Sequence, residues 1–269
     1  MGRISFQPFL ATEALLAGRI FDDRGNRMTP SHARKRGIKY KTGVKFTGAT
    51  QTDNAVTVSL ESGESFDADL LLVAVGRGPN SAGHGYEEAG VQTDRGFVLT
   101  DDRLRTNLPN VYAVGDLVPG LQLAHRGFQQ GIFIAEEIGG LNPRGIDELG
   151  IPRVTYCRPE VASVGLTEAQ AKDKYGNVET YIYSLGGNGK SQILKTTGGV
   201  KLVKAPDGPV VGITMVGDRV GELIGEAQLI YNWEAYPEDV TPLIHAHPTQ
   251  TEAIGEAFLA LAGKPLHVH

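Results

Sequence analysis

The sequence predicts a two-part protein, an α/β region followed by an α+β region built on an antiparallel sheet. Two observations favour the α/β part: a wholly apolar run at 70–76 (LLLVAVG) and, further on, a strand, a loop and a helix in succession. The third observation is a change of pattern near Pro152, after which short strands alternate with helices. We therefore expect a first region at 36–150 and a second at 151–269, behind an unassigned segment at 1–35.

Composition narrows the class of protein and its partners. The chain has 269 residues and a formal net charge of −5, and its densest basic stretch, 32–41, is short, so nucleic acid is not an expected partner. No apolar run reaches the roughly 18 residues that a membrane helix needs, and the N-terminus lacks the apolar core of a secretory signal. The single cysteine, Cys157, is expected to pack in a strand, and a reducing, cytoplasmic setting is the default expectation.

The first region opens with strands. Residues 55–68 (AVTVSLESGESFDA) alternate apolar and polar side chains around Ser62 and Gly63, which predicts a β-hairpin. The apolar run at 70–76 is closed by Gly76 and reads as a strand buried on both faces. Gly76 either lets a ligand approach the backbone or forms an ordinary turn.

The next pattern predicts a strand, a loop and a helix. Residues 110–116 (NVYAVGD) read as a strand that ends in Gly115 and Asp116, and residues 124–140 read as a helix with Phe128, Ile132 and Ala135 on one face. This order suits a nucleotide-binding α/β domain, in which ligands lie beyond the strand ends and near helix N-termini. The Asp116 carboxylate could accept hydrogen bonds from sugar or polyol hydroxyls, or it could cap a turn. The chain contains no G-x-G-x-x-G motif.

The second region begins with a strand and a turn over 153–167 (RVTYCRPEVASVGLT), followed by a helix with Thr167 as its N-cap. The runs VETYIYSL (178–185) and GGVKLVKAPDGPVVGITMVG (198–217), with a following helix at 220–233, complete an antiparallel sheet with helices. The run GGNGKS at 186–191 resembles a phosphate-binding loop only superficially, because Ser184 stands where that motif needs a glycine. We expect this run to be a loop turn.

The last segment, HAHPTQTEAIGEAF (245–258), holds two histidines before an amphipathic helix. Thr249 and Glu252 have the spacing of a capping box, and Gly263 should end the helix. That interpretation leaves His247 unexplained. A metal site at His245 and His247 is disfavoured because no nearby carboxylate or cysteine completes a ligand set.

Five blocks in order resemble the dihydrolipoyl dehydrogenase family of flavoprotein disulfide oxidoreductases. The blocks are VAVGRGPN (73–80), TNLPNVYAVGD (106–116), LQLAHRGFQQG (121–131), PRVTYCRPEVASVGLTE (152–168) and HAHPTQTEA (245–253). The resemblance covers about residues 35–269. It implies a partial FAD/NAD-binding α/β domain followed by an antiparallel-sheet interface (dimerisation) domain.

The resemblance also implies site residues, cofactors and partners. The active-site acid/base falls on His247 and the acid that orients it on Glu252, while flavin contacts fall on Asp116, Gly115 and Ala124. A glycine near NAD falls on Gly76. The reaction implied is oxidation of dihydrolipoamide carried by the lipoyl domain of a 2-oxo acid dehydrogenase complex. FAD and NAD are the implied cofactors, and the implied assembly is a homodimer.

The sequence also departs from that family. The redox pair of cysteines and the glycine-rich nucleotide motifs are not found in these 269 residues. Since Cys157 is the single cysteine, we expect the chain alone to be inactive as a dihydrolipoyl dehydrogenase and to bind FAD weakly. The alternatives are a non-catalytic dimerisation module, or part of a related flavin enzyme of the glutathione or mercuric reductase type.

Overall fold

A computed structural model of the chain describes residues 43–74 and 76–267. The chain divides into two compact units, Met1–Gly78 and Pro79–His269, and each is described by itself. The unassigned segment at 1–35 lies outside the described residues. Within the described ranges, no helix is both long enough and apolar enough to cross a membrane.

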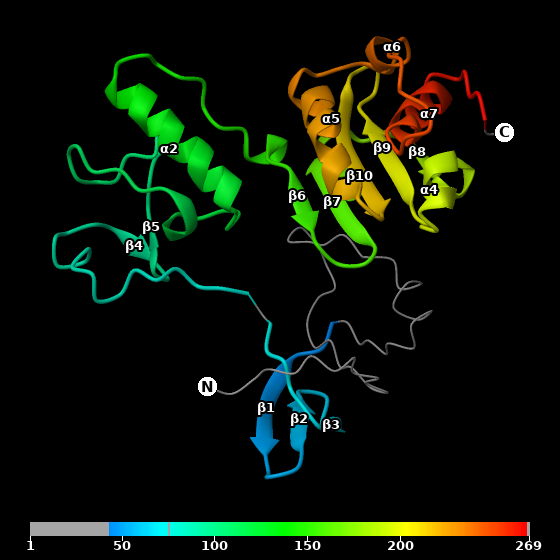
Figure 1. The fold of residues 1–269 in the computed structure, drawn as a ribbon. Helices are drawn as coiled ribbons and strands as arrows, with labels where there is room; N and C mark the ends of the chain where they lie inside the picture. The colour runs from blue at the N-terminus through cyan, green and yellow to red at the C-terminus, as the bar shows by residue number, and fades with distance from the viewer. Residues whose placement is uncertain (1–42, 75, 268–269) are drawn as a thin grey trace. The chain divides into compact units, whose positions relative to one another are not determined.

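The first unit contains a three-stranded antiparallel sheet, which Figure 1 shows in blue to cyan. Its strands follow one another in the sheet as they do in the chain: β1 (Phe46–Gln51), β2 (Val56–Leu60) and β3 (Ser65–Ala68). The predicted hairpin is confirmed, with Ser59 opposite Ser65 and Gly63 at a positive φ of 82° in the connecting turn. A glycine suits this turn because it has no Cβ to strain the left-handed conformation.

The described residues of the run at 70–76 do not form the strand expected there. Residues 70–74 have no regular secondary structure, and Leu72 is 83% exposed, with Leu70 and Val73 also exposed. A strand buried on both faces needs paired neighbours at both edges and cover on both sides. The described sheet of the first unit, β1–β3, does not supply them.

The second unit begins with a region that carries little sheet. Its elements are β4 (Thr93–Asp94), β5 (Phe97–Val98), η1 (Gly115–Leu117), α2 (Ala124–Ile138) and η2 (Glu148–Gly150). The strand predicted at 110–116 is wrong, because only Tyr112 forms an isolated bridge, to Arg105, before the chain turns into η1. A strand requires a continuous paired neighbour, and the described part of this region offers a single bridge partner.

The helix expected at 124–140 is confirmed as α2. Its inward face carries Arg126, Gln130 and Phe133, all buried. The face of Phe128 and Ile132 points to solvent, with Phe128 73% exposed. In this region the apolar face predicted from the sequence is therefore unpartnered among the described residues.

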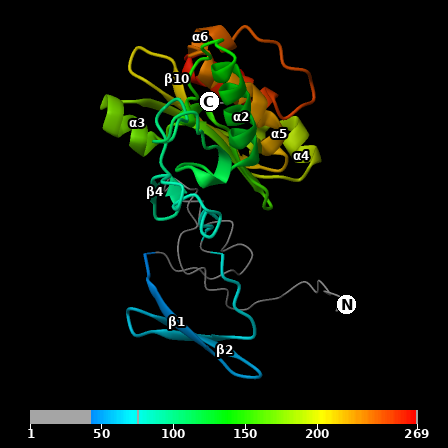
Figure 2. The same cartoon turned by 90° about the vertical axis from the view of Figure 1, so that its left-hand side faces the viewer.

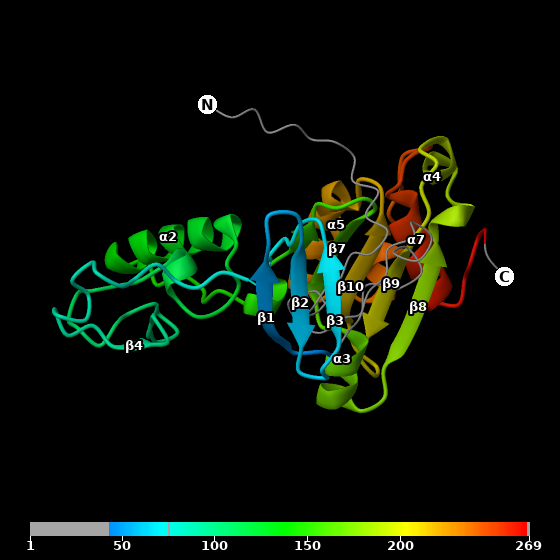
Figure 3. The same cartoon turned by 90° about the horizontal axis from the view of Figure 1, so that it is seen from below.

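The rest of the second unit is built on a five-stranded antiparallel sheet, as expected. In chain order the strands are β6 (Arg153–Thr155), β7 (Glu160–Gly165), β8 (Glu179–Ser184), β9 (Gly199–Lys204) and β10 (Val210–Gly217). Their order across the sheet is β6-β7-β10-β9-β8, and Figure 3 shows β7, β10, β9 and β8 side by side. The predicted strand and turn over 153–167 correspond to β6 and β7, which end at Gly165.

Helices cover both faces of this sheet (Figure 2). They are α3 (Glu168–Tyr175), η3 (Leu185–Gly187), α4 (Gly189–Ile193), α5 (Val220–Asn232), α6 (Pro237–Val240) and α7 (Glu252–Leu261). The larger core lies between the sheet and α5 and α7, and a smaller one forms against α3. Leu202 belongs to the first and Val203 to the second, as the two-residue period of a strand requires.

Two local expectations need correction. Cys157 is not packed in a strand: it lies exposed in the turn between β6 and β7. GGNGKS is more than a loop turn, because Asn188 caps the short helix α4 with its side-chain oxygen. Asparagine is a preferred N-cap residue, which explains why the chain turns into a helix there.

Candidate acid/base site at residues 245–252

The segment between α6 and α7 carries a paired imidazole and carboxylate. Nδ1 of His247 lies 2.9 Å from Oε1 of Glu252, the first residue of α7. Because an ionised carboxylate can only accept a hydrogen bond, Nδ1 is the protonated nitrogen of the neutral ring. Nε2 therefore carries the lone pair and makes no hydrogen bond within the described residues. The sequence predicted this pair, and the structure brings its two members together.

The other oxygen of Glu252 holds the backbone. The N–H of Thr249 donates to Oε2 of Glu252 over 2.7 Å, which is one half of the predicted capping box. The second half is missing, because the Thr249 hydroxyl donates to the Ala246 carbonyl over 2.6 Å instead. Gly263, with a φ of 74°, ends the helix as expected.

This geometry suits proton transfer at an accessible ring nitrogen. The His247 side chain is 78% exposed, whereas that of Glu252 is 24% exposed. Burial alone would raise the pKa of Glu252, but the Thr249 N–H and His247 outweigh it and lower the pKa below its ordinary value. An ionised Glu252 fixes the tautomer of His247 and stabilises its protonated form, so Nε2 can take up and return a proton.

His245 is held differently from its neighbour. Its Nε2 lies 2.7 Å from Oε1 of Glu226 on α5, and a methyl group placed on Gly255 would come within 2.7 Å of its Nδ1. The ring is thus packed between α5 and α7. Its pKa is raised, first by the hydrogen bond to Glu226 and then, despite burial, by the charges of Glu226 and Glu252. His245 and His247 thus bind different carboxylates, Glu226 and Glu252.

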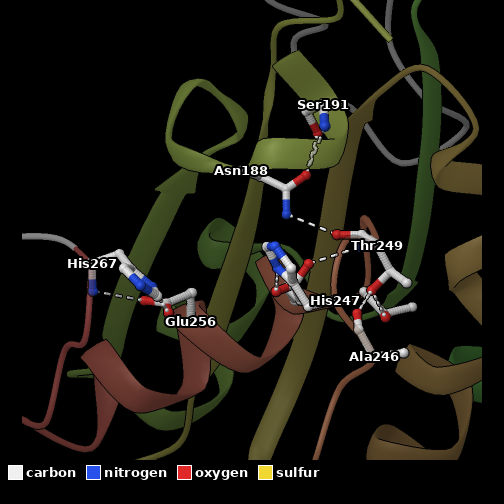
Figure 4. A network of polar contacts seen from close by, with 9 residues as sticks. Asn188, Ser191, Ala246, His247, Thr249, Glu256 and His267 are labelled. Atoms are coloured by element: carbon white, nitrogen blue, oxygen red, sulfur yellow. Dashed lines mark hydrogen bonds and ion pairs between the residues drawn. The ribbon is translucent and has the colours of Figure 1, made fainter. Parts of the chain in front are cut away.

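A further pair lies one turn along α7. Nδ1 of His267 is 2.6 Å from Oε1 of Glu256, and the His267 N–H donates to the other oxygen over 3.2 Å (Figure 4). Burial raises the pKa of nearby Tyr183, and the charges of Glu256 and Glu252 raise it further. Glu256 therefore fastens the end of the described chain onto the helix that carries Glu252.

A buried polar cluster supports the segment from behind. Asn188, Ser191 and Gln250 are all buried, and Asn188 donates from Nδ2 to the Thr249 carbonyl over 2.9 Å (Figure 4). Sequence reasoning missed Asn188 because GGNGKS was weighed as a phosphate loop and then predicted to be a loop turn. Its helix-capping residue type was the available signal, but its partner lies 61 residues away.

The residues expected to contact a flavin lie at the start of α2. The Gly115 N–H donates to Oε1 of Gln130 over 2.7 Å, and a methyl group on Gly127 would come within 3.4 Å of the Gly115 Cα. Asp116 is exposed in η1, and Ala124 is the exposed first residue of α2. The structure thus brings Gly115, Asp116 and Ala124 to one end of α2.

This end of α2 has the donors and acceptors that a polyol and a carbonyl group would need. Leu123 precedes the helix and has no capping side chain, so the first-turn N–H groups receive no capping oxygen from it. Asp116, in η1, is exposed to solvent. Gly76, the fourth residue expected to bind a cofactor, belongs to the first unit, where it has a φ of 115°.

Two family models match the chain. Residues 10–131 match the pyridine nucleotide-disulphide oxidoreductase model, and residues 151–258 match the dimerisation-domain model of the same enzymes. The first match begins inside the 1–35 segment that the sequence left unassigned. The predicted division at 150/151 stays a prediction.

Curated relatives are dihydrolipoyl dehydrogenases. The chain is 38% identical over 255 residues to one from Bacillus subtilis, covering 92% of this chain and 54% of that protein. It is 37% identical over 241 residues to one from Geobacillus stearothermophilus, covering 87% and 51%. The chain therefore spans about half the length of the curated relatives it matches.

Solved structures share the fold. LpdA from Mycobacterium tuberculosis aligns with a TM-score of 0.78 at 24% identity, covering 86% of this chain and 51% of that one. The flavoprotein disulfide reductase RclA from Escherichia coli aligns with a TM-score of 0.81 at 23% identity, covering 91% and 58%. At these identities the likeness concerns the fold alone.

Proposed function

Because the chain belongs to the pyridine nucleotide-disulphide oxidoreductase family, we propose that it supplies the acid/base pair and the dimerisation domain of a dihydrolipoyl dehydrogenase. The observation that carries this proposal is the His247–Glu252 pair, 2.9 Å apart on an exposed segment. The substrate class is a dithiol, dihydrolipoamide, carried on a lipoyl domain, and the electron acceptor is NAD.

In this proposal Nε2 of His247 removes a proton from a substrate thiol. A thiolate is the form that attacks a disulfide, so the proton must leave before sulfur–sulfur exchange begins. A histidine suits this task because it gains and loses protons near neutral pH. Glu252 keeps the proton of the neutral ring on Nδ1 and stabilises the imidazolium after transfer, as the third member of a catalytic triad does.

The residues at the start of α2 fit a flavin. Asp116 would accept hydrogen bonds from its polyol hydroxyls, and the N–H of Ala124 would donate to a ring carbonyl. When bound, FAD would accept an electron pair and pass it to NAD. The chain itself has one cysteine, Cys157, so the redox disulfide in this scheme comes from residues outside these 269.

A hybrid enzyme tests the role of His247. The aligned part of the Bacillus subtilis dihydrolipoyl dehydrogenase is replaced by this chain, and NAD-linked oxidation of dihydrolipoamide is measured. We expect the hybrid to be active and its His247→Gln variant to be slower by roughly 10²- to 10⁴-fold, the contribution of a positioned acid/base group.

The control for this experiment is His84→Gln, which removes an exposed histidine away from the 245–252 segment. It should leave the rate of the hybrid unchanged. Near-normal turnover in His247→Gln, in a hybrid that is otherwise active, would remove His247 from the acid/base role.

The second candidate function is a dimerisation module without catalysis. The match of residues 151–258 to a dimerisation domain favours it, as does the lone cysteine. Sedimentation equilibrium of the purified chain should give twice its 28.8 kDa mass at micromolar concentration. A mass that stays at one chain across the micromolar range would contradict self-association and leave this candidate without support.

A further inference from the structure

We propose that Asn188 is a positioning residue for the His247–Glu252 pair and that it acts through the backbone carbonyl of Thr249. This inference deepens the proposed function and rests on it, because it assigns to a buried amide the task of holding the acid/base histidine in place. Asn188 lies in the GGNGKS run (186–191), which has no role in the proposed function described above.

Asn188 makes more hydrogen bonds than a helix cap needs. Its Oδ1 accepts from both the N–H and the hydroxyl of Ser191, each over 2.8 Å, and this alone caps α4. Its Nδ2 points the other way and donates to the Thr249 carbonyl over 2.9 Å. Serine and aspartate also cap helices, but neither has an amide N–H to offer. The choice of asparagine therefore concerns Thr249.

Both backbone polar groups of Thr249 are hydrogen-bonded, and the N–H is bonded to a member of the acid/base pair. Its N–H donates to Oε2 of Glu252 over 2.7 Å, while Oε1 of Glu252 binds Nδ1 of His247 over 2.9 Å. The hydrogen bond from Asn188 fixes the carbonyl on the other side of the same residue (Figure 4). The carbonyl and the N–H of Thr249 belong to the two peptide planes that meet at its Cα, so the hydrogen bond to the carbonyl restrains the backbone from which the N–H reaches Glu252. Without that restraint, Glu252 loses a fixed partner for its carboxylate.

Burial makes this link strong. Asn188 is 3% exposed and Ser191 is fully buried, so water cannot replace a lost partner. Gln250 extends the cluster, since its Nε2 donates to the Asp218 carbonyl over 2.9 Å and lies 3.4 Å from the Ser191 hydroxyl. The carbonyl of Thr249 and the side chain of Gln250 are thus both hydrogen-bonded to the cluster at the start of α4.

The test measures the tautomer of His247 rather than activity. Asn188→Asp keeps the oxygen that caps α4 and removes the N–H that reaches Thr249. In the full 269-residue chain, ¹⁵N spectra of the imidazole at a pH where the ring is neutral report the ratio of its two tautomers. We expect the wild type to hold the proton on Nδ1 and Asn188→Asp to change that ratio about tenfold, the size of one net hydrogen bond.

Ser191→Ala is the matched control. It removes the hydroxyl from the same cluster but keeps the hydrogen bond from Asn188 to Thr249, so its tautomer ratio should equal that of the wild type. If Asn188→Asp does not fold, Asn188→Ser replaces it, because serine caps a helix but is too short to reach Thr249. A wild-type tautomer ratio in a folded Asn188 variant overturns the proposal. Because the readout requires no turnover, it is independent of the hybrid-enzyme test.

Discussion

At the scale of single residues, the candidate site depends on carboxylates that each hold one histidine. Glu252 binds His247, and Glu226 binds His245 two residues earlier. The two pairs differ in exposure: the side chain of His245 is 13% exposed and that of His247 is 78% exposed. His245 therefore anchors the segment in the fold, whereas the His247 side chain is exposed to solvent.

The His245–Glu226 pair should make stability depend on pH on the alkaline side. The pKa of His245 is raised above its ordinary value of 6.5, so the folded state binds the proton more tightly than the unfolded state. This contribution is complete below pH 6.5 and is lost as pH rises through the raised pKa. Urea unfolding between pH 6 and 9 should show that loss, and Glu226→Gln should reduce it.

A control variant on α5 separates the effect of Glu226 from that of the other carboxylates. Glu226 on α5 and Glu252 on α7 are the charges that raise the pKa of His245. Glu222→Gln, an exposed change one turn before Glu226 on α5, should retain the alkaline loss. An equal slope in wild type and Glu226→Gln would show that the pair contributes nothing to stability.

At the scale of elements, local sequence signals succeeded where their partners are close in the chain. The N-cap at Thr167 forms a complete capping box with Gln170, and the expected hairpin around Gly63 is present. The same spacing at Thr249 gave half a capping box, because its hydroxyl turns to Ala246 and its carbonyl to Asn188. The second of these partners is 61 residues distant, beyond any local pattern.

Elements that need distant partners were predicted less well. The apolar run at 70–76 has the composition of a buried strand. Among the described residues of the first unit, however, no strand pairs with it. The pair His247–Glu252 was predictable because five residues separate its members. The pair His245–Glu226 joins two helical layers across 19 residues and was not predicted.

The two threonines make a comparison of capping strength possible. Thr167→Ala removes a full capping box and should lower the free energy of unfolding by about 1 kcal/mol. Thr249→Ala removes a hydroxyl that caps no N–H of α7, so the first turn of α7 should not fray. Urea unfolding measures the first effect, and amide hydrogen exchange in α3 and α7 separates the two. Faster exchange at the start of α7 in Thr249→Ala would contradict this assignment.

At the scale of the whole chain, the fold class was predictable and the covering of one helix was not. The antiparallel sheet of the second unit and its flanking helices follow from alternating strands and amphipathic helices. The apolar face of α2 at Phe128 and Ile132 also follows from its pattern, but both side chains are exposed. A periodic pattern tells which face is apolar and does not supply the surface that covers it.

Two substitutions on that face test whether it is open in solution. The double variant Phe128→Asp and Ile132→Asp should change the free energy of unfolding by no more than about 0.5 kcal/mol, as exposed substitutions do. It should also bind less of a hydrophobic dye than the wild type. Phe133→Asp, on the buried face of the same helix, is the destabilising control. A large loss of stability in the double variant would mean that the face is covered.

The exposed apolar face of α2 should affect the half-life of the chain in a cell. Chaperones and proteases recognise apolar side chains that a finished protein keeps out of water. Both units expose apolar side chains of this kind: Leu70 and Leu72 in the first, and Phe128 and Ile132 in the second. The cellular abundance of this polypeptide should therefore be set by how soon another surface shields them, and its half-life should lengthen when that surface is co-expressed.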